Sequence, residues 1–179
     1  IHTGTSLPAN TNNYALSKSQ LLPWLEKYSQ RINIDHVISE YFYGPYDDEW
    51  KFVSMICSKL KKKESFINLS SGRQRRDFIY IDDLCEAYKY ILKNDSQAYQ
   101  GVQNWKVGSG ETIALRDLVL KCASLSENFE TDLRFGALED RQNELDQQET
   151  DQTDIKKLGW NPKTDLETGI NRVLKSIDV

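Results

Sequence analysis

Apolar residues recur along the chain with two alternating spacings, about every second residue and about every 3.6 residues, which is typical of a mixed α/β domain. An apolar stripe with helical spacing covers residues 16–28, and a strand is expected over residues 32–38. Pro23 lies inside the stripe, and we expect it to kink the helix because proline lacks the N–H that would bond to the carbonyl of Ser19. This part of the chain therefore predicts one kinked helix followed by one strand.

The remaining elements follow the same two spacings. Helices are expected over residues 52–60, 82–92, 115–122 and 166–174, and strands over residues 66–69, 78–81 and 105–107. Asp82 and Thr112 are expected to cap the second and third of these helices, and Thr164 with Glu167 forms a capping box for the fourth. Residues 139–154 are rich in acids and glutamines and predict a long polar loop.

Composition excludes several classes of protein. The 179 residues are 39% hydrophobic with four prolines and nine glycines, which argues against a disordered or collagen-like chain. No apolar run approaches the roughly 18–20 residues of a membrane span, and 23 basic against 27 acidic residues argue against a nucleic-acid or membrane partner. Cys57, Cys85 and Cys122 are widely spaced and form no Cys-x-x-Cys pair, so a reducing, cytoplasmic environment and no metal site are expected.

Tyr14 and Lys18 are the first residues with predicted chemistry. At a spacing of i, i+4 on a helix they share one face, about 5–6 Å apart at Cβ. An ammonium at that distance lowers the pKa of a phenol from about 10, which makes a tyrosine usable as a general acid or base. A hydroxyl-rich loop with Thr3, Thr5 and Ser6 lies just upstream and predicts a second hydrogen-bond donor beside the pair. An ordinary surface pair is the alternative.

A basic segment, Gly72–Arg76, leads directly into the strand predicted over residues 78–81. Guanidinium groups pair well with phosphate oxygens, and a loop that runs into a strand fixes their direction. The segment therefore predicts a phosphate contact, with a solvated basic loop as the alternative. Arg141 is the only base between residues 139 and 154, where an arginine would usually balance local negative charge.

Together and in this order, these features resemble the extended short-chain dehydrogenase/reductase family, the NAD(P)-dependent epimerases, dehydratases and reductases of nucleotide sugars. The landmarks of the resemblance are the Thr3 strand end, Tyr14-x-x-x-Lys18, Tyr43-Gly44-Pro45, Arg75–Asp83, Val107–Gly110, Arg141-x-x-Glu144 and Lys157–Pro162. They cover nearly the whole chain. The resemblance implies an α/β fold, with the end of a Rossmann-like parallel sheet and a smaller C-terminal α/β substrate-binding lobe.

The family also places a Gly-rich βαβ cofactor region ahead of its catalytic residues, and no Gly-x-x-Gly-x-x-Gly occurs in this sequence. About 120 residues of cofactor-binding sheet are therefore expected to be missing from the N-terminus. Residues 1–45 would be the remnant of the Rossmann domain with the catalytic Tyr/Lys helix. Residues 46–179 would be mainly the substrate-binding lobe, with residues 78–107 returning to the Rossmann sheet.

The resemblance implies a role for individual residues. Tyr14 would exchange a proton with a sugar oxygen during hydride transfer, Lys18 would hold the ribose of NAD or NADP, and Thr3 would bond the reacting oxygen. The positions implied for binding a nucleotide-diphosphate sugar are Tyr41, Phe52, Leu69, Arg76 and Arg141. Of these, the two arginines occupy positions at which the family binds the diphosphate, and the phenylalanine and leucine lie near the family's nucleobase pocket.

The sequence after Thr3 departs from sugar 4,6-dehydratases, because Gly4-Thr5 stands where these enzymes have an Asp-Glu pair. The loop that follows is also shorter than usual, so Thr5 or Ser6 is an alternative to Thr3. The resemblance favours a carbon-4 epimerase or keto-reductase of deoxysugars of bacterial surface polysaccharides, a homodimer when full length. A non-catalytic nucleotide-sugar-binding fragment and an RNA- or partner-binding module over residues 59–76 are the alternatives.

Overall fold

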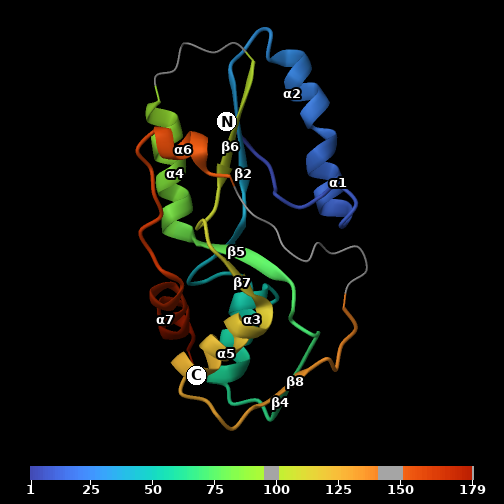
Figure 1. Ribbon diagram of the computed structural model, residues 1–179, viewed down its shortest axis with the longest axis vertical. Coiled ribbons are helices and arrows are strands. Elements are labelled where there is room, and N and C mark those ends of the chain that lie inside the picture. Colours follow the sequence, from blue (N-terminus) through green and yellow to red (C-terminus); the bar gives the residue numbers. More distant parts are fainter. Residues whose placement is uncertain (95–100, 141–150, 179) are drawn as a thin grey trace.

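A three-stranded parallel sheet forms one half of the molecule. The computed structural model describes residues 1–94, 101–140 and 151–178. The strands of this sheet are β1 (His2–Thr3), β2 (Ile34–Ser39) and β6 (Val102–Val107), with β2 in the middle. Figure 1 shows α1 (Asn13–Gln20) and α2 (Leu22–Tyr28) on one side of this sheet and α4 (Ile81–Lys93) and α6 (Thr153–Lys157) on the other.

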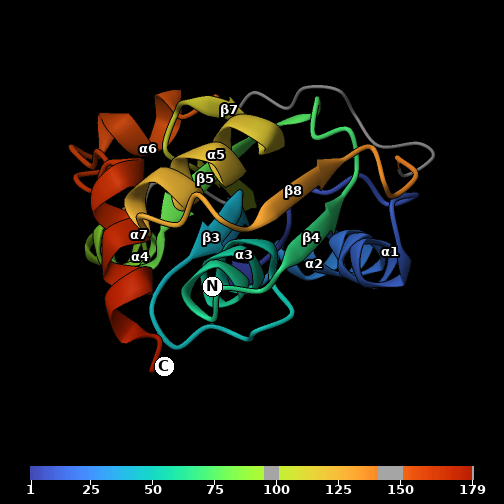
Figure 2. The same cartoon turned by 90° about the horizontal axis from the view of Figure 1, so that it is seen from below.

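The other half carries two smaller sheets and three helices. β3 (Tyr41–Tyr43) and β5 (Arg75–Tyr80) pair in parallel, and β7 (Thr112–Ala114) pairs with β5 in the antiparallel direction. β4 (Phe66–Leu69) and β8 (Asp132–Phe135) form a separate parallel pair, which is seen from below in Figure 2. α3 (Phe52–Lys61) packs against both α5 (Leu115–Leu125) and α7 (Leu166–Ser176).

Each half has its own hydrophobic core. The larger cluster lies among α3, α5, α7 and the smaller sheets, and its residues Ile56 and Leu118 are fully buried. The second cluster lies against the parallel sheet and includes Val107 and Trp160. Ile79 of β5 also belongs to this second cluster, so β5 joins the two halves. Each fully buried side chain of this kind stabilises the fold by about 1.5–3 kcal/mol.

Residues 13–28 form two helices rather than one kinked helix. α1 begins after Asn12, whose side chain accepts a hydrogen bond from the backbone N–H of Ala15 at 2.8 Å. It ends at Gln20, and α2 begins at Leu22 with Pro23 in its first turn. A proline there breaks no intrahelical hydrogen bond, because the N–H groups of the first turn have no helical partners. The predicted kink is therefore wrong, and Pro23 begins a new helix instead.

The predicted caps of three helices are also wrong. α4 begins one residue before Asp82, which lies inside its first turn, where a negative charge interacts favourably with the helix dipole. Thr112 belongs to β7 and pairs with β5, and α5 begins only after this strand. α7 is capped by Asp165, which accepts a hydrogen bond from Thr168 N at 2.8 Å in place of the Thr164–Glu167 box.

The predicted α/β class with a parallel sheet is confirmed. The boundary at residue 45 stays a prediction, and β3 ends at Tyr43, just before it. Of residues 78–107, β6 pairs with β2 in the parallel sheet, whereas Phe78–Tyr80 belongs to β5 and pairs with β3. Within the part of the chain that the structure describes, no helix is long and apolar enough to cross a membrane.

Candidate functional site

The predicted Tyr14/Lys18 pair forms on α1 beside the end of β1. The Lys18 ammonium donates a hydrogen bond to the backbone oxygen of Thr3 at 3.1 Å. Its Nζ atom lies 5.7 Å from the centre of the Tyr14 ring. Tyr14 is 54% exposed, so a bound molecule can reach this residue. The structure therefore brings together the three residues for which the sequence predicts catalysis.

Tyr88 of α4 is a fourth member of this cluster, which the sequence did not indicate. Its hydroxyl lies 2.8 Å from Thr3 Oγ1, close enough for a hydrogen bond. Burial raises the pKa of Tyr88, and the nearby Tyr14 adds to the rise, while the hydrogen bond to Thr3 opposes it. In the sequence Tyr88 belongs only to the apolar stripe of its helix. Its contact with Thr3 joins residues 85 positions apart, which no local spacing reveals.

The hydroxyls of the loop after β1 have different partners. The Thr3 hydroxyl faces Tyr88, as described above. Thr5 Oγ1 accepts a hydrogen bond from Leu7 N at 3.2 Å, within the loop itself. Ser6 Oγ donates to a carboxylate oxygen of Glu40 at 2.8 Å. Both alternatives to Thr3 therefore lie in a loop that is tied to the middle strand of the sheet.

Two histidines stack on the parallel sheet beside the cluster. His2 of β1 and His36 of β2 are register partners, with ring centres 4.9 Å apart and their Nδ1 atoms 2.7 Å apart. Burial lowers the pKa of both imidazoles, and Lys18 lowers that of His2 further. Gly4 packs against the second ring, because an added Cβ would lie 2.4 Å from His36 Cε1. The pair is therefore closely packed, and its surroundings favour the neutral form of both rings.

Arg76 and Tyr41, both predicted substrate contacts, lie together in the second sheet. The Arg76 guanidinium carbon is 5.9 Å from the centre of the Tyr41 ring, and the side chain is 3% exposed. Arg76 Nη1 donates to the backbone oxygen of Arg75 at 2.6 Å. Arg75 in turn donates to Thr112. Both arginines belong to β5, so the alternative of a solvated basic loop is wrong for them.

The basic residues of segment 59–76, the alternative RNA- or partner-binding module, lie in different surroundings. Lys59 forms an ion pair with Glu64 at 2.8 Å, and Lys62 lies 3.7 Å from Glu49. At the far end of the segment, Arg76 is buried in β5. The charges are therefore distributed over α3, a loop and a buried strand, which argues against RNA binding by this segment.

Asp77 connects the two sheets next to Arg76. It is 1% exposed, and its carboxylate accepts hydrogen bonds from Ser109 N and Ser109 Oγ, both at 2.7 Å, and from Gly110 N at 2.9 Å. Gly108 packs against the same carboxylate, because an added Cβ would lie 2.4 Å from Asp77 Oδ2. The loop after β6 is thereby fixed to β5.

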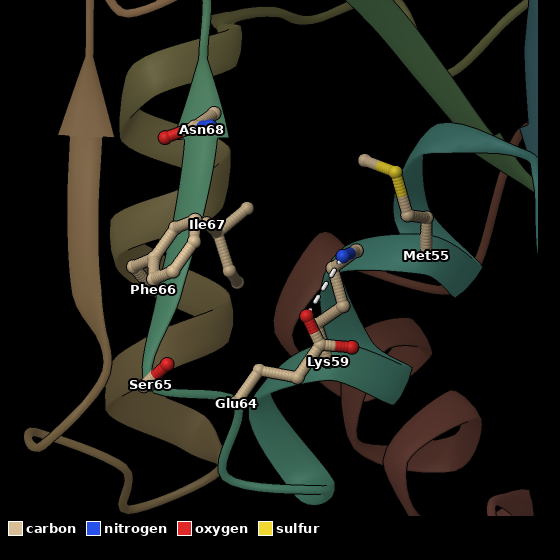
Figure 3. A pocket seen from close by; sticks show the side chains of 7 residues that line it. All are labelled: Met55, Lys59, Glu64, Ser65, Phe66, Ile67 and Asn68. Carbon is tan, nitrogen blue, oxygen red and sulfur yellow. Dashed lines mark hydrogen bonds and ion pairs between the residues drawn. The ribbon is translucent and has the colours of Figure 1, made fainter.

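The other predicted substrate contacts lie in the half with the two smaller sheets or outside the described residues. Leu69 is buried and Phe52 is partly buried, and both belong to the larger core. A cavity of about 450 Å³ lies between α3 and β4 (Figure 3), lined by Met55, Lys59, Glu64, Ser65, Phe66, Ile67 and Asn68. Neither Phe52 nor Leu69 lines it, although they lie on the same two elements. Arg141 lies outside the described residues.

The residues present fit the ribose end of a nicotinamide cofactor. An ammonium carries three donors, and among the described residues Lys18 makes one hydrogen bond, to Thr3 O. The loop over residues 4–12, between β1 and α1, contains one glycine, which packs against His36. It therefore does not offer the Gly-rich turn that binds dinucleotide phosphates. Within the described ranges, no group of three His, Cys, Asp or Glu side chains could hold a metal ion.

Comparison with known proteins identifies a family for this chain. Residues 2–108 match the model of the NAD dependent epimerase/dehydratase family. CDP-abequose synthase of Salmonella typhimurium is 35% identical over 139 residues, which cover 77% of this chain and 46% of the relative. The dTDP-4-dehydro-6-deoxyglucose reductase of Escherichia coli is 28% identical, with coverage of 92% of this chain and 52% of the relative. The chain thus spans about half the length of these curated relatives.

Solved structures show the same fold. A tyrosine-to-phenylalanine mutant of UDP-glucuronic acid 4-epimerase from Bacillus cereus, in complex with a fluorinated UDP-sugar and NAD, superposes with a TM-score of 0.85 at 20% identity. The match covers 98% of this chain and 60% of the solved chain. The UDP-glucose 4-epimerase of Thermus thermophilus, in complex with NAD, gives a TM-score of 0.80 at 18% identity and covers 98% and 62%. The Rossmann-like fold predicted from the motifs is confirmed.

Proposed function

The chain belongs to the NAD-dependent epimerase/dehydratase family. We propose that it supplies the catalytic Tyr14/Lys18 pair and the diphosphate-binding residues of a nucleotide-sugar oxidoreductase. The proposed reaction is reduction or epimerisation at carbon 4 of a CDP-linked deoxysugar. The observation that carries the proposal is the cluster of Thr3, Tyr14 and Lys18 at the carboxyl end of a parallel strand. The names of the two relatives support a deoxysugar nucleotide and favour CDP as the first one to test.

Tyr14 is the proposed acid/base. Its exposed hydroxyl would give a proton to the carbonyl oxygen at carbon 4, or take one from the hydroxyl there. Lys18, held by Thr3 O, would bind the cofactor ribose. A bound nicotinamide supplies or accepts the hydride. Whether the cofactor is NAD or NADP stays open.

We propose Thr5 as the hydroxyl that bonds the reacting oxygen, in preference to Thr3. The Thr3 hydroxyl is 2.8 Å from Tyr88 OH, so it already has a partner on the α4 side of the sheet. Thr5 Oγ1 accepts from a backbone N–H, which leaves its own O–H to donate to a substrate oxygen. Of the alternatives that the loop offers, Thr5 therefore fits best.

At the other end of the proposed site, Arg76 would pair with the diphosphate, with Tyr41 stacked beside it. Arg141, Phe52 and Leu69 are retained as proposed contacts of the phosphate and nucleobase. We further propose a cytoplasmic enzyme, because its three cysteines are all free thiols and a reducing compartment would keep them so. A homodimer of the complete enzyme is also proposed.

Tyr14→Phe tests the proposed function. Turnover of CDP-linked 4-keto-deoxysugars is measured with NADH and NADPH, using the protein encoded by the whole reading frame. We expect the variant to lose turnover by at least about 100-fold, because the proton donor is removed. The affinity for CDP, measured by calorimetry, should stay the same. Tyr28→Phe is the matched control, since this tyrosine is similarly exposed on α2.

The outcomes separate the two remaining interpretations. Turnover by the parent protein and its loss in Tyr14→Phe support the enzyme. Binding of CDP-sugars without turnover by the parent, with either cofactor, would instead support a non-catalytic binding fragment. Full activity of Tyr14→Phe would rule out the assigned chemistry.

A further inference from the structure

A buried carboxylate lies where the chain passes from one sheet to the other. Glu40 is the single residue between β2 and β3, and it is 6% exposed. Its backbone N–H donates to the oxygen of Val107 at 2.9 Å, so the crossing is fixed to the end of β6. Removing a charged carboxylate from water is costly unless hydrogen bonds compensate. Its partners therefore indicate what this carboxylate does.

One partner belongs to the catalytic loop. Ser6 Oγ donates to Glu40 Oε2 at 2.8 Å, and Ser6 N donates to the oxygen of Ser39 at 3.3 Å. The residue immediately before Ser6 is Thr5, the proposed donor to the reacting oxygen. The carboxylate thus holds the loop one residue away from the proposed chemistry.

Glu40 is also closely packed against the end of β6. An added Cβ on Gly108 would lie 2.9 Å from Glu40 Cγ and 2.4 Å from Asp77 Oδ2. The glycine therefore packs closely against both carboxylate side chains. The residue after Glu40 is Tyr41, and the centre of its ring lies 5.9 Å from the guanidinium carbon of Arg76. Glu40 consequently links the loop of Thr5 to the strand that carries the proposed phosphate contact.

We propose that Glu40 is a positioning residue, which through Ser6 holds the Thr5 hydroxyl in line with Tyr14 at the reacting oxygen. This proposal rests on the proposed function. A displacement of about 1 Å in a catalytic group can lower the rate by about 100-fold. Loss of the Ser6–Glu40 hydrogen bond is therefore expected to lower kcat by about 10- to 100-fold, while the binding of nucleotide sugar is unchanged.

Ser6→Ala and Glu40→Gln test the proposal in the protein encoded by the whole reading frame. Ser6→Ala should lower kcat with KM and the affinity for CDP unchanged. Glu40→Gln keeps one oxygen that can accept from Ser6 Oγ, so it should lower kcat less, and the double variant should be no slower than Ser6→Ala. Ser6→Thr, which keeps a hydroxyl, should recover most of the kcat that Ser6→Ala loses. Ser126→Ala is the control, because the side chain of this serine also donates a hydrogen bond within the chain, to Ala123 O, but lies at the end of α5.

Two results would overturn the positioning role. One is an unchanged kcat in Ser6→Ala, which is informative even if Glu40→Gln fails to fold. The other is a rise in KM without a fall in kcat, which would make Ser6 a direct sugar contact. The Tyr14→Phe variant is measured in parallel. If it retains turnover, the proposed function fails; if it loses turnover while Ser6→Ala does not, only the role of Glu40 fails.

Discussion

Replacement of Asp77 by asparagine is expected to destabilise the fold strongly, although the two side chains have nearly the same shape. Asp77 Oδ1 accepts two hydrogen bonds from Ser109, and Oδ2 accepts one from Gly110 N. An asparagine has one oxygen and one NH₂ group in place of the two oxygens. When its oxygen takes the Oδ1 position, its NH₂ group faces the N–H of Gly110. Two donors then oppose each other at a contact of 2.9 Å.

The size of the effect follows from these contacts. A hydrogen bond to a charged group contributes about 1.5–3 kcal/mol, and one of the three is lost. The other two become neutral and lose about half of their strength. Gly110 is exposed, so water can reach its N–H and the penalty for an unpaired buried donor is reduced. The two weakened bonds together lose about 1.5–3 kcal/mol, and the exchange of the Gly110 contact for a contact with water adds about 0.5–1 kcal/mol. We therefore expect Asp77→Asn to lower the free energy of unfolding by about 2–4 kcal/mol.

Thermal unfolding followed by circular dichroism measures this change. For a chain of this length 1 kcal/mol corresponds to about 2–4 °C, so Tm should fall by roughly 5–15 °C. Asp48→Asn is the control: it makes the same chemical change at an exposed position and should shift Tm by less than about 2 °C. If Asp77→Asn shifted Tm no more than this control does, the carboxylate would not connect the sheets as argued.

Three further changes have defined expectations. Arg76→Lys keeps the charge but loses the planar fork, so the Kd for CDP should rise about 10-fold in calorimetry, and an unchanged Kd would argue against a phosphate contact. Gly108→Ala places a methyl group 2.4 Å from Asp77 Oδ2 and should lower the urea midpoint by an amount equivalent to about 1–3 kcal/mol; an unchanged midpoint would contradict this packing. Burial lowers the pKa of His2 and His36 below the usual 6.5, so below that pH the unfolded chain binds more protons than the folded one. Tm should therefore fall as the pH is lowered from 7.5 to 5.5, and it should fall less in His36→Asn. An equal fall in both proteins would exclude the histidine pair as the cause.

The sequence predicts an element well when the residues that define its pattern all lie within the element itself. The stripe that predicts a helix over residues 82–92 contains Leu84, Ala87 and Ile91, all buried in α4, which runs from Ile81 to Lys93. Its boundaries are close to the prediction because the same residues that define the stripe also form the contact with the core.

Elements defined by distant partners were predicted poorly. β6 begins at Val102, three residues before the expected strand, because Gln103 and Asn104 pair with β2 despite their polar side chains. Thr112 was expected to cap a helix, but its pairing with β5 places it in a strand. Local propensity cannot show such pairings, since the partner strand lies more than 30 residues away in the sequence.

The same distinction applies to the candidate site. The Tyr14/Lys18 pair lies within one helical turn, so its spacing alone predicts that the two side chains meet. Tyr88 reaches Thr3 across 85 positions, and the His2–His36 contact spans 34. These residues are adjacent only because β1 pairs with β2 and α4 covers the sheet. Spacing rules therefore indicate the Tyr14/Lys18 pair, but they cannot indicate the contact of Tyr88 with Thr3 or that of His2 with His36.

The two halves of the proposed site are positioned by the residues at which the chain crosses between sheets. Tyr14 and Lys18 lie beside the parallel sheet, whereas Arg76 lies on β5 in the second sheet. The distance between them thus depends on how the sheets are joined. Glu40 joins β2 to β3 and holds the catalytic loop, and Asp77 fixes the end of β6 to β5. Both are buried carboxylates, so the alignment of the proposed proton donor with the proposed phosphate contact depends on these polar contacts as well as on the hydrophobic contacts of Ile79.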